Sequence, residues 1–413
     1  MGRGEGLRAR GNLRVALVAA AALGAGGALG WALWAKQRPR PRPRLDADAW
    51  RALCAASRAP LPHGPRPLAK MRQIVMQGGV VDAVRPLAWP ILFGLDPGDE
   101  DIEASGTQHA AASSAGGGWR RRRALQERRR ERYLSLVAEV NEALGGSGPQ
   151  AEGPLGEAAR VLDIDLQRMS DAVSMRPELR RIVLAHVAWD PALGYCQGMA
   201  EVAAPFLGVL RQFGDVDTLG DVMGNGDDGD GGARVTLAES EAFWLYEAVL
   251  KNHLGGNFRD GFRGVWRQLG HLRRLCTRHD PALTRAVVLS SSSRGEEERA
   301  GMGEVAARVH AEPFLFCFRA LLLGFRRELS RDAFLVLLEA QAADPEPGRA
   351  ATLACRFAAA VLMQQRASLM AHDGSELGRD EACYGLFRDA EKTIAFWPAL
   401  VRAQTIHARK APH

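Results

Sequence analysis

Residues that build metal sites and disulfide frameworks are scarce in this sequence. Its 413 residues include only six cysteines, which are scattered without a C-x-x-C pair or the paired Cys/His spacing of a zinc site. We therefore predict reduced thiols, no disulfide framework and no metal site. Glycine fingerprints for phosphate binding are also missing, because no G-x-x-x-x-G-K-[ST] stretch occurs and no G-x-G-x-x-G opens a helix after a strand pattern. The chain is thus not expected to bind and hydrolyse a nucleotide by itself.

Excess positive charge is scarce outside the N-terminal region. The formal net charge is +6, but residues 1–44 hold nine Lys and Arg residues against Glu5 alone, which leaves −2 for residues 45–413. Residues 45–413 therefore produce no overall positive electrostatic field that would attract a phosphate backbone, so we predict no nucleic-acid partner. The run from Trp119 to Tyr133 contains eight arginines. It is typical of a solvated helix face, with contact to an acidic partner or lipid as the alternative.

Long hydrophobic runs are limited to one stretch. Val15–Ala35 is uncharged for 21 residues, which is long enough to span a bilayer, and basic residues flank it on both sides. We favour an N-terminal membrane anchor, with a cleaved signal or organelle transit peptide and an Ala-rich buried helix as alternatives. The Arg/Pro-rich run Gln37–Arg44 predicts an extended, solvated spacer after it.

The rest of the chain predicts an all-α domain interrupted by insertions. Apolar residues recur at helical spacing, and no clean apolar/polar alternation of strands stands out. We expect a linker at 45–70, a helical domain at 71–400 and a tail at 401–413. Gly-, Ser- or acid-rich composition predicts insertions near 96–118, 145–156, 214–232 and 290–303. The clearest helical patterns lie at Leu179–Val187, Phe314–Leu338, Leu353–Met370 and Leu386–Leu400.

Two short segments differ from core-building sequence. Asp165 and Arg168 are three residues apart and therefore neighbours on one helical face or turn. Gly194–Met199 follows a predicted helix stop at Pro191 and places Gln197 on a tight turn flanked by glycines. Taken singly, these residues are explained by ordinary roles: a surface arginine, a helix cap and a loop amide.

At these segments the chain resembles the TBC-domain GTPase-activating proteins for Rab GTPases. The I-x-x-D-x-x-R motif of that family appears as Leu162-x-x-Asp165-x-x-Arg168, and its Y-x-Q-G motif as Tyr195-Cys196-Gln197-Gly198. Upstream, Arg85, Trp89, Leu92 and Gly94 fit the opening R-x-x-x-W-x-x-L-x-G motif. Downstream, Glu241–Leu250 and Pro313–Leu329 are similar to the later F-W and F-x-R-W motifs. The similarity covers about residues 71–340 in five ordered motifs.

The resemblance implies a two-lobed helical domain that activates GTP hydrolysis on a Rab GTPase in its GTP form. Arg168 would supply an arginine finger and Gln197 a glutamine finger to the partner, and Asp165 would orient Arg168. Transition-state logic supports this pair, because phosphoryl transfer needs a fixed cation and an amide that orients water. The chain would be a GTPase activator and not itself a hydrolase. It would need no cofactor, since the partner brings GTP and Mg²⁺.

The resemblance also implies supporting roles for four other motif residues. Tyr195 and Gly198 would shape the turn that aims Gln197. We expect Trp89 in the core and Arg85 paired with a buried carboxylate. A Rab regulator would act on membrane traffic at the cytosolic face of an intracellular membrane. The protein would instead be cytoplasmic without an anchor, or organellar if residues 1–44 are a transit peptide.

Three positions depart from the family pattern. Met169 stands where a Thr usually follows the finger arginine, Ala320 where a Trp is usual, and Leu338 where a Trp-Glu pair is common. We expect these changes to affect core packing more than chemistry. They also leave an alternative function, a catalytically silent Rab-binding effector or scaffold.

Overall fold

The computed structural model consists almost entirely of helices. It describes residues 42–57, 61–62, 64–96, 117–145, 153–213, 235–292, 312–344, 352–370, 383–387 and 394–406. Within these ranges the only extended pairing is an isolated parallel bridge between Leu45 and Val80. The predicted all-α class is therefore confirmed. The predicted anchor at 15–35 and most of the four predicted insertions lie outside these ranges.

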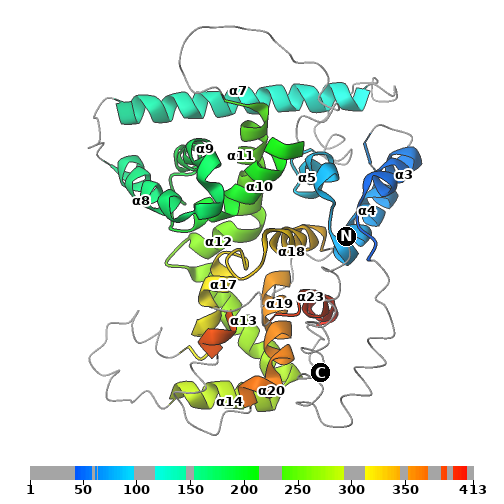
Figure 1. Cartoon of the computed structure of the whole chain (residues 1–413), viewed down its shortest axis with the longest axis vertical. Helices are drawn as coiled ribbons and strands as arrows, with labels where there is room; N and C mark the ends of the chain where they lie inside the picture. The colour runs from blue at the N-terminus through cyan, green and yellow to red at the C-terminus, as the bar shows by residue number, and fades with distance from the viewer. Residues whose placement is uncertain are drawn as a thin grey trace, which may run out of the picture. The chain divides into compact units, whose positions relative to one another are not determined.

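The helices form two packed groups, which we call the first and second lobes (Figure 1). The first lobe comprises η1 (Asp82–Val84), α5 (Arg85–Leu92), α7 (Gly117–Gly145), α8 (Pro154–Arg168), η3 (Ser170–Met175), α9 (Arg176–Trp189), α10 (Met199–Phe213) and α11 (Leu237–Val249). Within this lobe α10 packs on α9 and α11, and α7 crosses both α9 and α11. The 3₁₀ turn η3 joins α8 to α9 and begins after Met169, the residue that follows Arg168.

The second lobe is built around α13 and α19. It comprises α13 (Arg263–His279), α14 (Pro281–Ser292), η6 (Leu315–Cys317), α17 (Phe318–Leu322), α19 (Leu353–Gln364), α20 (Arg366–Met370) and α23 (Phe396–Thr405). The π-helical η5 (Leu250–Leu254) and α12 (Gly255–Phe258) connect the lobes. A further set, α3 (Ala47–Ser57), α4 (Pro65–Gly78) and α18 (Arg331–Ala343), is arranged so that α18 contacts α4, α5 and α19.

Apolar spacing explains which helices are central and which are peripheral. In α13 the buried residues Val265, Leu269, Leu272 and Cys276 follow one helical face, while arginines occupy the other. In α10 nearly every residue from Met199 to Leu210 is buried. A helix that is apolar all round lies inside a domain, so α10 forms the centre of the first lobe.

The arginine-rich α7 is only partly a solvated face. Its Arg122 is buried and donates to the carbonyl oxygens of Leu87 and Pro86 at 3.2 and 2.8 Å. Desolvation lowers the pKa of Arg122 from its ordinary value. Two helical turns later, Arg129 donates from Nε and Nη2 to the two carboxylate oxygens of Glu241, at 3.3 and 3.2 Å. These two arginines therefore fasten α7 to the lobe, and most of the other described arginines of the run remain exposed.

Two expectations from the sequence need correction. The segment 45–70 is not a linker, because α3 and the start of α4 lie in it and Trp50 and Leu53 join the core. The helical pattern Phe314–Leu338 is not one helix. It breaks between α17 and α18, where Gly324 and Phe325 both adopt left-handed backbone conformations, with φ +60° and +69°.

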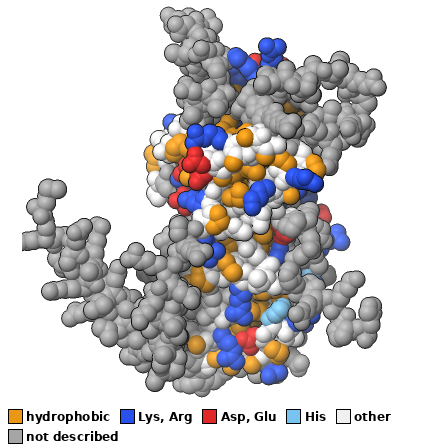
Figure 2. All heavy atoms as spheres, turned by 90° about the vertical axis from the view of Figure 1, so that its right-hand side faces the viewer, with side chains coloured by type: hydrophobic (Ala, Val, Ile, Leu, Met, Phe, Trp, Pro, Cys, Tyr) orange, Lys and Arg blue, Asp and Glu red, His pale blue; other side chains and the backbone are white. Residues whose placement is uncertain are grey.

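The described surface carries mixed charge. Figure 2 shows one face on which Lys and Arg side chains lie in separate groups, with acidic and apolar side chains between them. The described part of this face therefore presents no continuous basic stripe of the kind that follows a phosphate backbone. Among the helices that the structure describes, none is both long enough and apolar enough to cross a membrane.

Candidate functional site

Arg168 is the last residue of α8. Leu162, Asp165 and Leu166 hold the buried face of that helix, whereas the Arg168 side chain is 65% exposed. Its Nη1 lies 3.8 Å from Oδ1 of Asp165, one turn earlier in the same helix. A cation at a helix C-terminus also interacts favourably with the helix dipole. The end of the helix therefore presents to solvent a guanidinium that forms a long ion pair with one carboxylate.

Gln197 projects from a turn between α9 and α10. The turn begins at Asp190, whose backbone oxygen accepts from the N–H of Gly194 at 3.0 Å. Gly194 and Gly198 both have positive φ, +63° and +94°. Glycine adopts such angles without a steric penalty, so the sequence makes a sharp reversal possible at both ends of the turn. Gln197 itself is exposed between them.

Asp165 joins the two segments that the sequence analysis singled out. Its Oδ2 accepts from the Tyr195 hydroxyl at 2.7 Å and from the Gly198 backbone N–H at 3.0 Å. The carboxyl is 8% exposed, so these bonds form in a largely dry environment, where they are strong. The structure therefore brings Asp165, Arg168, Tyr195 and Gly198 together, and Gln197 lies between two of them in the chain.

Tyr195 remains a hydrogen-bond donor under ordinary conditions. Burial is the largest factor that raises the pKa of its phenol, followed by the hydrogen bond to Asp165. Because the raised pKa lies above the ordinary value of 10.0, the hydroxyl stays protonated in the folded protein through neutral pH. The turn is thus fastened to α8 by a neutral donor and a backbone amide.

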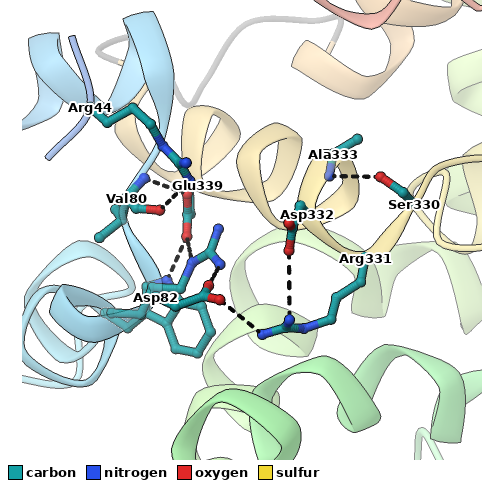
Figure 3. A network of polar contacts seen from close by, with 10 residues as sticks. Arg44, Val80, Asp82, Ser330, Arg331, Asp332, Ala333 and Glu339 are labelled. Atoms are coloured by element: carbon teal, nitrogen blue, oxygen red, sulfur yellow. Dashed lines mark hydrogen bonds and ion pairs between the residues drawn. The ribbon is translucent and has the colours of Figure 1, made fainter. Parts of the chain in front are cut away.

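Arg85 and Trp89 belong to a separate buried network. Glu339 on α18 accepts from Arg85 Nε at 2.7 Å, from Trp89 Nε1 at 2.9 Å and from the backbone N–H of Val80 at 2.9 Å. Figure 3 shows Glu339 pointing toward Val80 and Asp82, and Arg85 also pairs with Asp82. Arg85, Trp89 and Glu339 are all fully buried. The network fastens α5 to α18 and does not reach Arg168 or Gln197 through any contact described above.

The three departures from the family pattern all lie in the core. Met169, Ala320 and Leu338 are buried, with 6%, 1% and 5% of their surface exposed. Met169 follows Arg168, so an apolar side chain occupies that position and packs inward. The departures therefore change packing beneath the site, while the polar groups that hold Arg168 and the Gln197 turn are complete.

Sequence reasoning missed three charged residues near these networks. Glu339 holds Arg85, and Glu201 and Arg327 pair with each other beside the Gln197 turn. The available signal was a charge within an otherwise apolar run, as for Glu339 in FLVLLEA. Such a charge is rarely buried unless it is paired, but its partner cannot be named from spacing alone.

Arg168 and Gln197 are exposed side chains and not the lining of a pocket. A pocket of about 360 Å³ lies nearby between α9, α11 and η5, and neither Arg168 nor Gln197 lines it. Within the described residues, no group of three or more His, Cys, Asp or Glu side chains is arranged to hold a metal ion. An exposed cation and an exposed amide on a rigid base are suited to act on a second macromolecule.

The chain matches a known domain family over most of its length. A sequence model of the Rab-GTPase-TBC domain matches residues 82–370. The chain belongs to this family. The matched TBC domain contains all seven residues proposed from the sequence, from Arg85 to Gly198.

Relatives of this TBC domain are similar over shorter segments. Rab GTPase-activating protein 22 of Arabidopsis thaliana is 27% identical over 169 residues, which are 41% of this chain and 22% of that protein. Human TBC1 domain family member 16 is 28% identical over 163 residues, 39% of this chain and 15% of that protein. The similarity therefore covers only a small part of each relative.

Solved structures share the fold. The Ypt/Rab-GAP domain of Gyp1p superimposes with a TM-score of 0.54 at 18% identity, covering 82% of this chain and 93% of that domain. The Chlamydomonas flagellar RabGAP TBC domain gives a TM-score of 0.50 at 14% identity, covering 87% and 90%. The two-lobed helical arrangement is thus that of TBC domains.

Proposed function

We propose that this chain accelerates GTP hydrolysis by a Rab-type GTPase, with Arg168 and Gln197 inserted into the nucleotide site of the partner. Membership of the TBC family supports the class of partner. The observation that carries the chemistry is the shared carboxylate: Asp165 lies 3.8 Å from Nη1 of Arg168 and accepts hydrogen bonds from both ends of the Tyr195–Gly198 turn. The arginine and the glutamine therefore project from one rigid support.

The proposed chemistry divides between the two side chains. In the transition state of GTP hydrolysis, negative charge spreads over the transferred phosphoryl oxygens while water attacks in line. The planar guanidinium of Arg168 would donate to these oxygens, and the Gln197 amide would orient the water. GTP and Mg²⁺ would come with the partner. An arginine supplied in this way is worth on the order of 10³–10⁵ in rate.

Single-turnover GTP hydrolysis tests the proposal. A panel of GTP-loaded Rab proteins would be mixed with the full-length chain and with Arg168→Ala and Gln197→Ala. We expect acceleration of at least one Rab, and a loss of about 10³-fold in each variant. Arg160→Ala, at an exposed arginine two turns earlier on α8, is the matched control and should keep the wild-type rate.

The same experiment distinguishes the alternative effector function. Binding of a GTP-loaded Rab without acceleration, and with no change in rate in either variant, would make the chain a silent Rab-binding protein. Acceleration that survives both substitutions would show that the fingers are assigned to the wrong residues.

We further propose that residues 15–35 anchor the domain at the cytosolic face of an intracellular membrane. The uncharged stretch with basic flanks supports this location, where an anchor would raise the effective concentration near a membrane-bound Rab. Protease treatment of intact vesicles is the test. Digestion of a C-terminal tag is expected, and its protection, or an N-terminus absent from the mature protein, would contradict the proposal.

A further inference from the structure

The turn that carries Gln197 is also contacted from the second lobe, which includes residues 323–330 after α17, because Phe325 packs on Phe357 of α19. A Cβ placed on Gly198 would lie 3.1 and 3.2 Å from the two Cδ atoms of Leu323 and 3.5 Å from Nη2 of Arg327. Both residues belong to the segment between α17 and α18. This segment therefore packs directly against the glycine that ends the turn.

Arg327 is bound to the start of α10 by a two-pronged ion pair. Its Nε lies 2.9 and 3.0 Å from the two carboxylate oxygens of Glu201, and its Nη2 lies 2.5 Å from Oε1. The neighbouring Arg326 donates from Nε to the backbone oxygen of Glu201 at 3.0 Å. Consecutive arginines thus hold both the side chain and the backbone of one residue in the first turn of α10.

Glu201 is directly coupled to the turn. Its backbone N–H donates to the Gly198 oxygen at 3.1 Å, while the Gly198 N–H donates to Asp165. The backbone N–H of Gly198 is therefore bound by Asp165 of the first lobe. Its carbonyl oxygen is bound by Glu201, which Arg327 of the second lobe holds in turn. The pKa of Arg327 is raised above its ordinary value, chiefly by the hydrogen bond to Glu201, and Asp165 is among the contributing charges.

The location and geometry of the Arg327–Glu201 ion pair indicate its structural role. The side chains of Arg327 and Glu201 are 35% and 23% exposed, so the ion pair lies at the edge of the surface and not in the core. The fork of an arginine nevertheless fixes the geometry of a carboxylate, because two parallel N–H groups meet its two oxygens. The pair therefore restricts where the first turn of α10, and the glycine before it, can lie.

We propose that Arg327 is a positioning residue for Gln197, which it serves by locking Glu201 and so fixing the turn from the second lobe. This inference rests on the proposed function. Arg327 does not touch the partner in this scheme, and its effect on hydrolysis passes through the glutamine. The Gln197 turn is then aligned only when the two lobes are in register.

Hydrogen exchange tests the positioning without any GTPase. Backbone amides from Gly198 to Glu201 would be compared in the full-length chain and in Arg327→Met. The matched control is Arg366→Met, which removes a half-exposed arginine whose Nε lies 2.8 Å from Asp280 Oδ2 in the second lobe. We expect exchange at the turn to be faster by about tenfold in Arg327→Met only. Unchanged exchange at the turn would overturn the inference, whatever the fate of the proposed function.

Kinetics separate positioning from a merely structural role. At saturating chain and with a responsive Rab, Arg327→Met should lower the maximal single-turnover rate by about tenfold, with the half-saturating concentration unchanged. Glu201→Gln should also lower the maximal rate and leave the half-saturating concentration unchanged. Agreement between the two variants shows that the effect is not a folding defect of one of them. In a Gln197→Ala background, Arg327→Met should change the rate by less than about twofold. An equal loss in both backgrounds would overturn the inference.

Discussion

Two carboxylates organise this molecule, Glu339 in the core and Asp165 beside Arg168 and the Gln197 turn. Each carboxylate accepts one hydrogen bond from a backbone N–H and one from a neutral aromatic side chain, and each also pairs with an arginine. They differ in where the arginine goes. The Arg85 side chain is completely buried and lies 2.7 Å from Glu339, whereas the Arg168 side chain is 65% exposed and approaches Asp165 only to 3.8 Å.

Under the proposed function, burial and not the kind of hydrogen bond separates an arginine that supports the fold from one that acts on a partner. A buried ion pair cannot reach a partner, and removing one member leaves an uncompensated charge in the core. A half-held arginine at a helix end keeps most of its donors available to an incoming phosphate. The Glu339 network should therefore respond to mutation with a loss of stability, and the Asp165 network with a loss of rate.

The largest effect on stability is expected for Glu339→Ala. The variant removes the acceptor of three buried donors and leaves Arg85 with Asp82 as its carboxylate partner. We expect the free energy of unfolding to fall by about 3–5 kcal/mol in urea titrations. Asp163→Ala, which breaks a half-exposed pair with Arg180, is the control and should cost less than about 1 kcal/mol. Similar losses in both variants would refute the comparison.

Asp165→Asn should reverse the balance between rate and stability. Without the charge, Arg168 loses its ion pair and the turn loses its strongest acceptor, so the single-turnover rate should fall by about 10²-fold. Unfolding should become easier by no more than about 2 kcal/mol. Asp163→Asn, two residues earlier on α8, keeps the rate in our scheme. If Asp165→Asn kept a normal rate and lost much of its stability, Asp165 would be a residue that supports the fold, as Glu339 is.

Gly198→Ala tests how tightly the turn is packed. The substitution meets both a positive φ and the side chain of Leu323, so we expect a loss of about 2 kcal/mol together with a lower rate. Gly194→Ala measures the cost of the positive φ alone, because φ is also positive there but an added Cβ would have Pro191 O, at 3.8 Å, as its nearest neighbour. Equal costs in thermal melting would show that the Leu323 contact contributes nothing.

The smallest effect is expected for Tyr195→Phe. Only the 2.7 Å hydrogen bond to Asp165 is lost, which should cost about 1 kcal/mol in chemical denaturation and a modest factor in rate. Tyr133→Phe removes an equally short bond, to the buried Glu239, far from the turn in sequence. That variant should lose stability without losing rate. A rate loss in Tyr133→Phe would show that the assay reports stability.

Helical spacing was sufficient for the fold class, whereas the candidate site residues were selected by the resemblance to TBC domains, because each has an ordinary explanation when taken singly. Helical spacing, the Asp165-x-x-Arg168 register and a turn bounded by glycines all depend on neighbours within a few residues, and short-range patterns of this kind survive in the linear sequence. The break at Gly324 and Phe325 was missed because the apolar spacing continues across it. The helix α3 was missed because only Trp50 and Leu53 mark its buried face.

Composition and short-range spacing by themselves determined an all-α chain, and the motifs shared with TBC domains selected one arginine and one glutamine in it. Only the tertiary structure decided which charges hold them. Arg85 and Glu339 are 254 residues apart in the chain, and Arg327 and Glu201 are 126 apart. No periodicity links such positions, because the partner of a buried or half-buried charge is chosen by the packing of whole helices against one another.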